Sequence, residues 1–171
     1  MSDNQKTLNS SIEFAGVGLH TGEDVHMVIE PARINHGVKF QRIDLDNQPI
    51  LPADINLVTD TQRSTTLEKD NVKIVTVEHL MSALYALGVN NVLIKMDSSE
   101  VPILDGSAKY FVVEIQKVGL KVQDAPLKYI DLPDPIHYTD PDSGSEILFV
   151  PTNHFVISVV LDYQNHSLAT I

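Results

Sequence analysis

Residues 76–88 of this chain read Thr-Val-Glu-His-Leu-Met-Ser-Ala-Leu-Tyr-Ala-Leu-Gly. Apolar residues recur here at the three- and four-residue spacing of a helix that is buried along one side. The pattern predicts a helix over residues 77–87, with Thr76 as its N-cap and Gly88 as its end. The apolar stripe of this helix consists of Val77, Leu80, Met81, Leu84 and Leu87.

The sequence before this helix predicts strands. Residues 6–16 are polar and β-prone, and apolar residues alternate with polar ones over residues 25–30 and 38–41. Residues 63–68 and 72–75 predict two further strands joined by a turn, because each is a short β-prone run and turn-forming residues separate them.

After the helix, residues 91–96 predict a strand and residues 107–118 a second helix. Asp105 or Ser107 is the expected cap of the second helix, and Gly119 ends it. A run of strands followed by strand and helix in alternation is typical of an α+β layer. We therefore expect an α+β fold in which a sheet carries both helices on one face.

The C-terminal third of the chain has a different character. Residues 129–132, 147–150 and 155–163 are strand-like, but no predicted helix follows to cover them. A sheet buries its apolar face against another layer. We therefore expect a first α+β domain over residues 1–122, a linker over 123–127 and, over 128–171, the start of a second, similar domain whose remainder is absent.

Composition narrows the classes of function. The chain has no cysteine, which excludes disulfides and thiolate chemistry, and its net charge of −11 argues against a nucleic-acid surface. No apolar run approaches the ~20 residues of a membrane-spanning helix. The N-terminus is polar and has no apolar stretch of a signal peptide, so a cytoplasmic location is expected.

Glu78 and His79 place a carboxylate and an imidazole side by side at the start of the first helix. A metal bound by His79 could hold a water molecule that Glu78 reaches, which is the arrangement of metal-assisted hydrolysis. A structural interpretation stays open, since Glu is favourable near a helix N-terminus and a single His can simply pack there. Residue 83 is Ala83, not a second ligand, and a catalytic zinc needs three protein ligands. At least two of them must come from elsewhere.

Other stretches could contribute polar groups to a site. Residues 16–22, Gly-Val-Gly-Leu-His-Thr-Gly, precede a strand and not a helix, so we interpret them as a glycine-rich connection that carries His20 and not as a phosphate loop. The polar run at residues 60–66 contains Thr61 and Arg63, which could line a substrate pocket or lie on a plain exposed strand. Asp105 either caps the second helix or orients the site. The remaining histidines are expected on the surface: His26, His36, His137, His154 and His166.

Three of these motifs together resemble a known family. Residues 16–22, 76–80 and 102–107 occur in the order and approximate spacing of the zinc-dependent UDP-3-O-acyl-N-acetylglucosamine deacetylases, and the chain resembles the N-terminal part of that family throughout. The resemblance implies hydrolysis of an acetamide on a UDP-linked, O-acylated glucosamine in lipid A biosynthesis. It also implies that His79 ligates Zn²⁺ and that Glu78 is the general base. His20, Thr61, Arg63 and Asp105 would lie near the substrate in supporting roles.

The chain also departs from the family. The resemblance implies two further zinc ligands in a His-Lys-x-x-Asp motif of a second domain, and no such motif occurs here. We therefore expect the full zinc site to need ligands from outside this chain, and the chain alone to be inactive. The second domain would also cover the helix face of the first. The alternative is a non-enzymatic α+β binding module that has kept the first-domain fold, in which Glu78 and His79 are structural.

Overall fold

The computed structural model describes residues 4–130 and 132–161. The chain divides into two compact units, Met1–Leu127 and Lys128–Ile171, and each is described by itself. Unit 1 contains both predicted helices and most of the strands, and unit 2 is built around a β-hairpin.

The central sheet of unit 1 has the strand order β2-β3-β9-β4-β5. Strand β9 lies in the middle, antiparallel to β3 and parallel to β4. The parallel pair requires a long connection between β4 and β9, and α1 lies within it. The bounds are Ile12–Val17 for β2, Asp24–Pro31 for β3, Val38–Arg42 for β4, Ile50–Pro52 for β5 and Val92–Met96 for β9.

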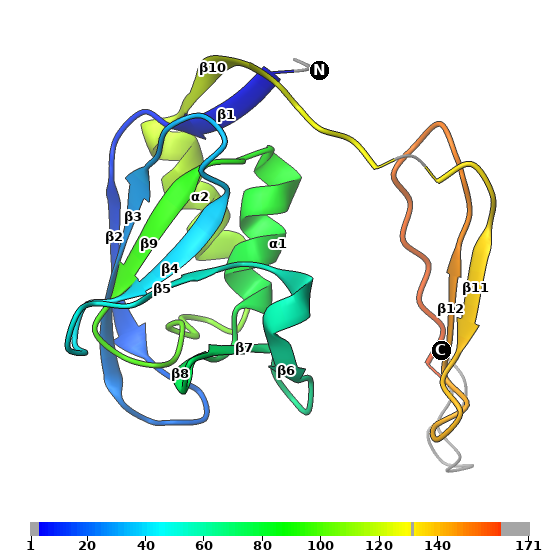
Figure 1. Ribbon diagram of the computed structural model, residues 1–171, viewed down its shortest axis with the longest axis horizontal. Coiled ribbons are helices and arrows are strands. Elements are labelled where there is room, and N and C mark those ends of the chain that lie inside the picture. Colours follow the sequence, from blue (N-terminus) through cyan, green and yellow to red (C-terminus); the bar gives the residue numbers. More distant parts are fainter. Residues whose placement is uncertain (1–3, 131, 162–171) are drawn as a thin grey trace. The chain divides into compact units, whose positions relative to one another are not determined.

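Helices α1 (Glu78–Leu87) and α2 (Lys109–Val118) lie on the same face of this sheet (Figure 1). Alternation along the strands points one set of side chains toward the helices, and these are buried. The ring centroids of Phe14 on β2 and Phe111 on α2 are 5.0 Å apart in an edge-to-face contact. The predicted α+β fold with two helices on the sheet is confirmed. The buried strand residues are Ile12, Phe14, Val25, Met27, Ile29, Phe40, Leu51, Val92, Ile94 and Met96.

A smaller sheet of β6 (Val58–Asp60), β7 (Thr66–Lys69) and β8 (Val72–Ile74) precedes α1. Strand β6 follows a short 3-10 helix, Ile55–Leu57, that the sequence pattern did not reveal. The strand expected over residues 63–68 begins only at Thr66, because Arg63 has a left-handed backbone (φ 63°) that interrupts an extended strand.

The expected linker over residues 123–127 lies largely within a strand. Strand β10 (Leu120–Pro126) pairs antiparallel with β1 (Asn4–Leu8), and Gln5 donates a side-chain hydrogen bond to the Pro126 carbonyl at 3.0 Å. The segment is extended because β1 offers it backbone partners, which its polar, proline-ended sequence does not reveal. The strand expected over residues 6–16 is two strands: β1 pairs with β10, and β2 pairs with β3.

In unit 2, β11 (Ile136–Thr139) and β12 (Glu146–Phe149) form an antiparallel hairpin. Asp140 closes its turn by accepting hydrogen bonds from the Ser143 backbone at 2.7 Å and hydroxyl at 2.8 Å. Strand β12 matches the strand expected over residues 147–150. Residues 129–130, 132 and 155–161 are irregular and not the expected strands, because no neighbouring strand pairs with them among the described residues. Residues 131, 162 and 163 of those expected strands lie outside the described ranges.

Candidate functional site

Glu78 and His79 open helix α1 as the first two residues of its first turn. The His79 Nε2 lies 4.0 Å from the Glu78 Oε1, and the two side chains are 31% and 37% exposed. The backbone N–H of Thr65 donates to the Glu78 Oε2 at 2.9 Å. One carboxylate oxygen is thus held by the polar run at residues 60–66, while the other faces the imidazole. A carboxylate and an imidazole that are both accessible and adjacent can share a ligand or a proton.

Thr76 does not cap α1 as expected. Val77 is the N-cap residue and makes no side-chain capping bond. The Thr76 hydroxyl instead donates to the Glu100 carboxylate at 2.7 Å, and Thr76 has a left-handed backbone with φ 59°. That conformation costs a non-glycine residue roughly 1–2 kcal/mol, and the buried hydrogen bond to Glu100 offsets this cost.

Glu100 was missed by the sequence analysis, yet it is fully buried beside the start of α1. Its carboxylate accepts hydrogen bonds from the backbone N–H groups of His20, at 3.0 Å, and Thr21, at 2.8 Å. The hydroxyls of Thr21, at 2.9 Å, and Thr76 donate to it as well. Burial raises the pKa of Glu100, but the hydrogen bonds from Thr21, Thr76 and His20 outweigh it and hold that pKa below its ordinary value. A lone carboxylate next to the apolar run at residues 101–104 was the available signal.

The glycine-rich run at residues 16–22 connects two antiparallel strands, β2 and β3, as interpreted from the sequence. Gly18 is buried against Glu100, and a Cβ at this position would lie 2.5 Å from the Glu100 Oε2 and 2.3 Å from the Thr21 Oγ1. A Cβ at Gly16 would lie 3.0 Å from the Pro102 Cβ. These two glycines therefore allow close approach to the β9–α2 connection, while His20 stays exposed at the end of the run.

Residues 99–103 of the β9–α2 connection lie between the glycine-rich run and the start of α1. The Val75 N–H donates to the Ser99 carbonyl at 2.8 Å, and the Val101 N–H donates back to the Val75 carbonyl at 3.0 Å. On the other side the Ile103 N–H donates to the Val17 carbonyl at 3.1 Å. Three motifs that are far apart in sequence thus meet at one end of unit 1 (Figure 1).

The remaining predicted site residues are exposed. Asp105 accepts hydrogen bonds from the Ser107 backbone at 3.1 Å and hydroxyl at 2.9 Å, and the Ser107 hydroxyl chiefly holds the pKa of Asp105 below its ordinary value. The N-cap residue of α2 is Ala108, and not Asp105 or Ser107 as expected, although the Ser107 hydroxyl accepts from the Lys109 N–H at 3.1 Å. Thr61 and Arg63 belong to the run whose Thr65 binds Glu78, but among the described residues neither side chain forms a hydrogen bond or ion pair with Glu78.

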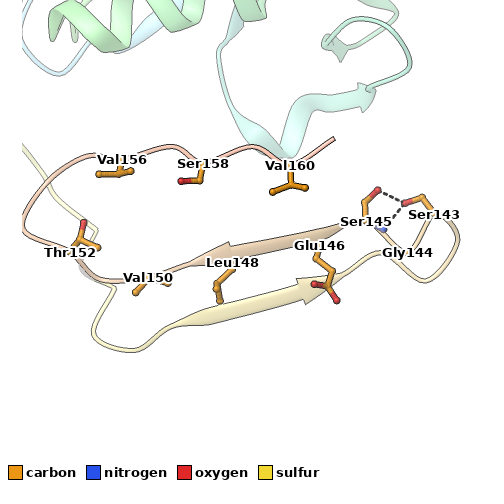
Figure 2. Close-up of a pocket in the computed structure, with 10 residues that line it drawn as sticks. All are labelled: Ser143, Gly144, Ser145, Glu146, Leu148, Val150, Thr152, Val156, Ser158 and Val160. Atoms are coloured by element: carbon orange, nitrogen blue, oxygen red, sulfur yellow. Dashed lines mark hydrogen bonds between the residues drawn. The ribbon is translucent and has the colours of Figure 1, made fainter. Parts of the chain in front are cut away.

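Of the other histidines described by the structure, His26, His137 and His154 are exposed, as expected, and His36 is half-buried. His166 lies outside the described residues. A hollow in unit 2 is lined by side chains of the hairpin and of the irregular segment after it, from Ser143 to Val160 (Figure 2). It contains neither Glu78 nor His79.

Zinc requires more ligands than this arrangement offers. Within residues 4–130 and 132–161, no three His, Asp or Glu side chains gather closely enough to hold a metal ion. Among the described residues His79 forms an ion pair with Glu78 alone, so these residues do not form a complete zinc site. No helix in the described part of the chain is both long and apolar enough to cross a membrane. The cytoplasmic location stays a prediction.

Comparison with known proteins identifies the family. A family model described as UDP-3-O-acyl N-acetylglycosamine deacetylase matches residues 5–170. The chain belongs to this deacetylase family. It is 46% identical over 161 residues to the bifunctional enzyme LpxC/FabZ of Bacteroides thetaiotaomicron, with 94% of this chain and 35% of that protein covered. The resemblance inferred from the three motifs is confirmed.

Other members of the deacetylase family are similar over the same extent. The chain is 43% identical to the UDP-3-O-acyl-N-acetylglucosamine deacetylase of Chromohalobacter salexigens and 44% identical to that of Hahella chejuensis, each over 161 residues and 94% of this chain. These alignments cover 52% and 53% of the two relatives. The chain thus spans about half the length of these deacetylases and about a third of the bifunctional enzyme.

Proposed function

We propose that this chain supplies Glu78 and His79 to the active site of a zinc-dependent deacetylase. The reaction is hydrolysis of the acetamide of UDP-3-O-acyl-N-acetylglucosamine to the free amine and acetate, in lipid A biosynthesis. Membership of the deacetylase family supports the reaction class. The observation that carries the assignment of residues is the accessible pair at the start of α1, with the His79 Nε2 4.0 Å from the Glu78 Oε1.

Glu78 is the proposed general base. Hydrolysis of an amide needs a group that takes a proton from the attacking water, and a carboxylate within hydrogen-bond reach of that water can do so. The Thr65 N–H fixes one oxygen of Glu78 and so orients the other toward His79. Because the Glu78 carboxylate is already oriented, little side-chain entropy is lost when the substrate binds.

His79 is the proposed ligand that this chain gives to Zn²⁺. A catalytic zinc takes three protein ligands and keeps one position open, and the described residues bring one imidazole to this place. We therefore infer that the other ligands come from outside residues 4–130 and 132–161, and that the 171-residue chain alone is inactive or nearly so. In the complete enzyme a further domain would cover the exposed side of the helices.

His20, Thr61, Arg63 and Asp105 are proposed to support substrate binding. All are exposed, and each lies in or beside a segment that contacts the start of α1 directly or through Glu100. Arg63 is the proposed partner of a substrate phosphate, since a guanidinium can bind phosphate oxygens through two parallel hydrogen bonds.

Acetate release from the UDP-linked substrate tests the proposal. In the complete gene product that contains this chain, Glu78→Gln should lower kcat by at least about 100-fold, the scale of a lost acid–base group. His79→Ala should lower kcat at least as much, because one of the three zinc ligands is lost. Only His79→Ala should also lower the zinc content. His36→Ala, at a half-buried histidine on another loop, is the matched control. Undiminished turnover in either active-site variant would contradict the proposed roles of these residues, and no acetate release by the unsubstituted gene product would favour a binding module.

A further inference from the structure

We propose that Glu100 is a positioning residue, whose buried carboxylate fixes the His20–Thr21 backbone and the start of α1 relative to each other. This inference rests on the proposed function for its catalytic consequence, but its structural part does not. Glu100 accepts from donors of both segments: the backbone N–H groups of His20 and Thr21 and the hydroxyls of Thr21 and Thr76.

The hydrogen bonds of Glu100 indicate that it links two segments of the chain and does not serve as the partner of a cationic side chain. No ion pair with a Lys or Arg side chain is formed by Glu100 in the part of the chain that the structure describes. Its charge is instead stabilised by successive backbone N–H groups, an arrangement that binds anions. Burial of a carboxylate is costly unless hydrogen bonds satisfy it. All four donors must therefore keep their positions, which makes the connection rigid.

One unfavourable backbone conformation and one close packing contact converge on this carboxylate. Thr76 has a left-handed backbone, and Gly18 has no room for a Cβ because Glu100 lies against it. Residues held in sparsely populated conformations cluster at functional sites when the surrounding structure over-determines them. Here the surrounding structure includes the Val75 backbone bonds on either side of Glu100.

The consequence is a fixed relationship between two candidate site groups. His20 directly precedes the Thr21 backbone that Glu100 binds, and Glu78 begins two residues after Thr76. Loss of the Glu100 carboxylate would release the glycine-rich run and allow His20 to move relative to Glu78. Displacement of a positioned group by about 1 Å can cost 100-fold in rate.

Substitution of Glu100 in the complete gene product tests this. Glu100→Ala should lower kcat about 100-fold, with a smaller rise in KM, because His20 is one of several proposed substrate contacts and the others are retained. Glu100→Gln should recover most of the rate, because its carbonyl oxygen can accept from His20 and Thr21 while its amide donates to the Thr76 hydroxyl. The effects of Glu100→Ala and His20→Ala should be less than additive in free energy, as for residues that act through one another.

Glu30→Ala is the matched control, because Glu30 is a carboxylate paired with Lys95 at 2.8 Å on the face of the sheet away from the helices. It should leave kcat unchanged. A folded Glu100→Ala variant with normal kcat, or with an effect fully additive with that of His20→Ala, would overturn the positioning role.

Hydrogen exchange separates this inference from the proposed function. In Glu100→Ala the amides of His20 and Thr21 should exchange at least about tenfold faster while those of β3 and β9 keep their protection, because only the former lose their acceptor. Should Glu100→Ala fail to fold, Thr21→Val and Thr76→Val each remove one donor and should give a partial effect. Unchanged exchange at His20 and Thr21 would overturn the inference. Absence of deacetylase activity in the unsubstituted complete gene product would overturn only the proposed function and would leave the structural role of Glu100 standing.

Discussion

The backbone N–H of Thr65 donates to the Glu78 Oε2 at 2.9 Å, and the Thr65 carbonyl accepts from the Val77 N–H at 3.3 Å. This two-way link ties the end of the polar run to the start of α1. One oxygen of Glu78 therefore forms a structural hydrogen bond, and the other stays available for catalysis. Substitution can separate these two roles.

Glu78→Gln should change stability little and activity greatly. The glutamine carbonyl can still accept from Thr65, so the expected loss of stability is about 0.5–1 kcal/mol, from the lost charge near the helix N-terminus. Glu78→Ala should lose about 1–2 kcal/mol, because the Thr65 N–H loses its partner. Urea unfolding of the 171-residue chain measures both. Equal losses of stability in the two variants would contradict a structural bond through Glu78.

Thr76→Val should destabilise the chain by about 1–3 kcal/mol, since it leaves the buried Glu100 carboxylate without one of its donors. Thr76 is 2% exposed, so water cannot replace the hydroxyl. Thr76→Ser is the control, because it keeps the hydroxyl and removes the β-branch, and it should stay within about 1 kcal/mol of the unsubstituted chain. Thermal and urea unfolding would check the order of the three proteins. A Thr76→Val chain as stable as the control would show that the bond to Glu100 contributes nothing.

The sequence predicted the parts of the fold that local pattern controls. The alternation at residues 25–30 and 38–41 and the helical spacing at 77–87 correspond to β3, β4 and α1, because each element buries its own apolar face. It did not predict β10, which exists only because β1 lies beside it. The irregular residues 155–161 show the converse, since a strand-like sequence without a partner strand among the described residues stays irregular.

The candidate site divides in the same way. Glu78 and His79 were identified from their place at a predicted helix start, which is a local property. Glu100 was not identified, because its role depends on donors some 80 residues earlier in the sequence, at His20 and Thr21. Thr76 was assigned to the wrong partner for the same reason: a hydroxyl before a helix usually caps it, unless a buried carboxylate from another segment lies closer.

Gly18→Ala should destabilise the chain by about 1–3 kcal/mol through overpacking. The added Cβ would lie 2.5 Å from the Glu100 Oε2 and 2.3 Å from the Thr21 Oγ1, so both hydrogen-bonded groups must move. Gly22→Ala separates this effect from backbone strain, since Gly22 has φ +68° and open space around it. That control should cost about 1 kcal/mol and should leave the exchange rates of the His20 and Thr21 amides unchanged. Fast exchange of the His20 and Thr21 amides in both variants would indicate that either substitution loosens residues 16–22, whatever its contact with Glu100.

The pH dependence of stability should carry a contribution from Glu100. Hydrogen bonds from Thr21, Thr76 and His20 hold the pKa of this carboxyl below its ordinary value despite burial, which raises it. A carboxyl with a lowered pKa in the folded state binds its proton more weakly there than in the unfolded chain. Its stabilising contribution is therefore complete above the unfolded pKa of about 4.3, and it is lost as the pH falls from there through the lower, folded-state pKa.

The Glu100→Gln variant makes this contribution visible. The difference in unfolding free energy between the unsubstituted chain and Glu100→Gln should be constant from about pH 6 to 8 and should shift below about pH 4.3, in the direction that disfavours the chain with the carboxylate. Asp44, Asp105 and Asp140 also have a lowered pKa, but they are present in both proteins and cancel in the difference. Urea unfolding at a series of pH values measures it. A difference that stays constant down to pH 3 would mean that Glu100 has the same proton affinity in the folded and unfolded chains, which its set of donors does not permit.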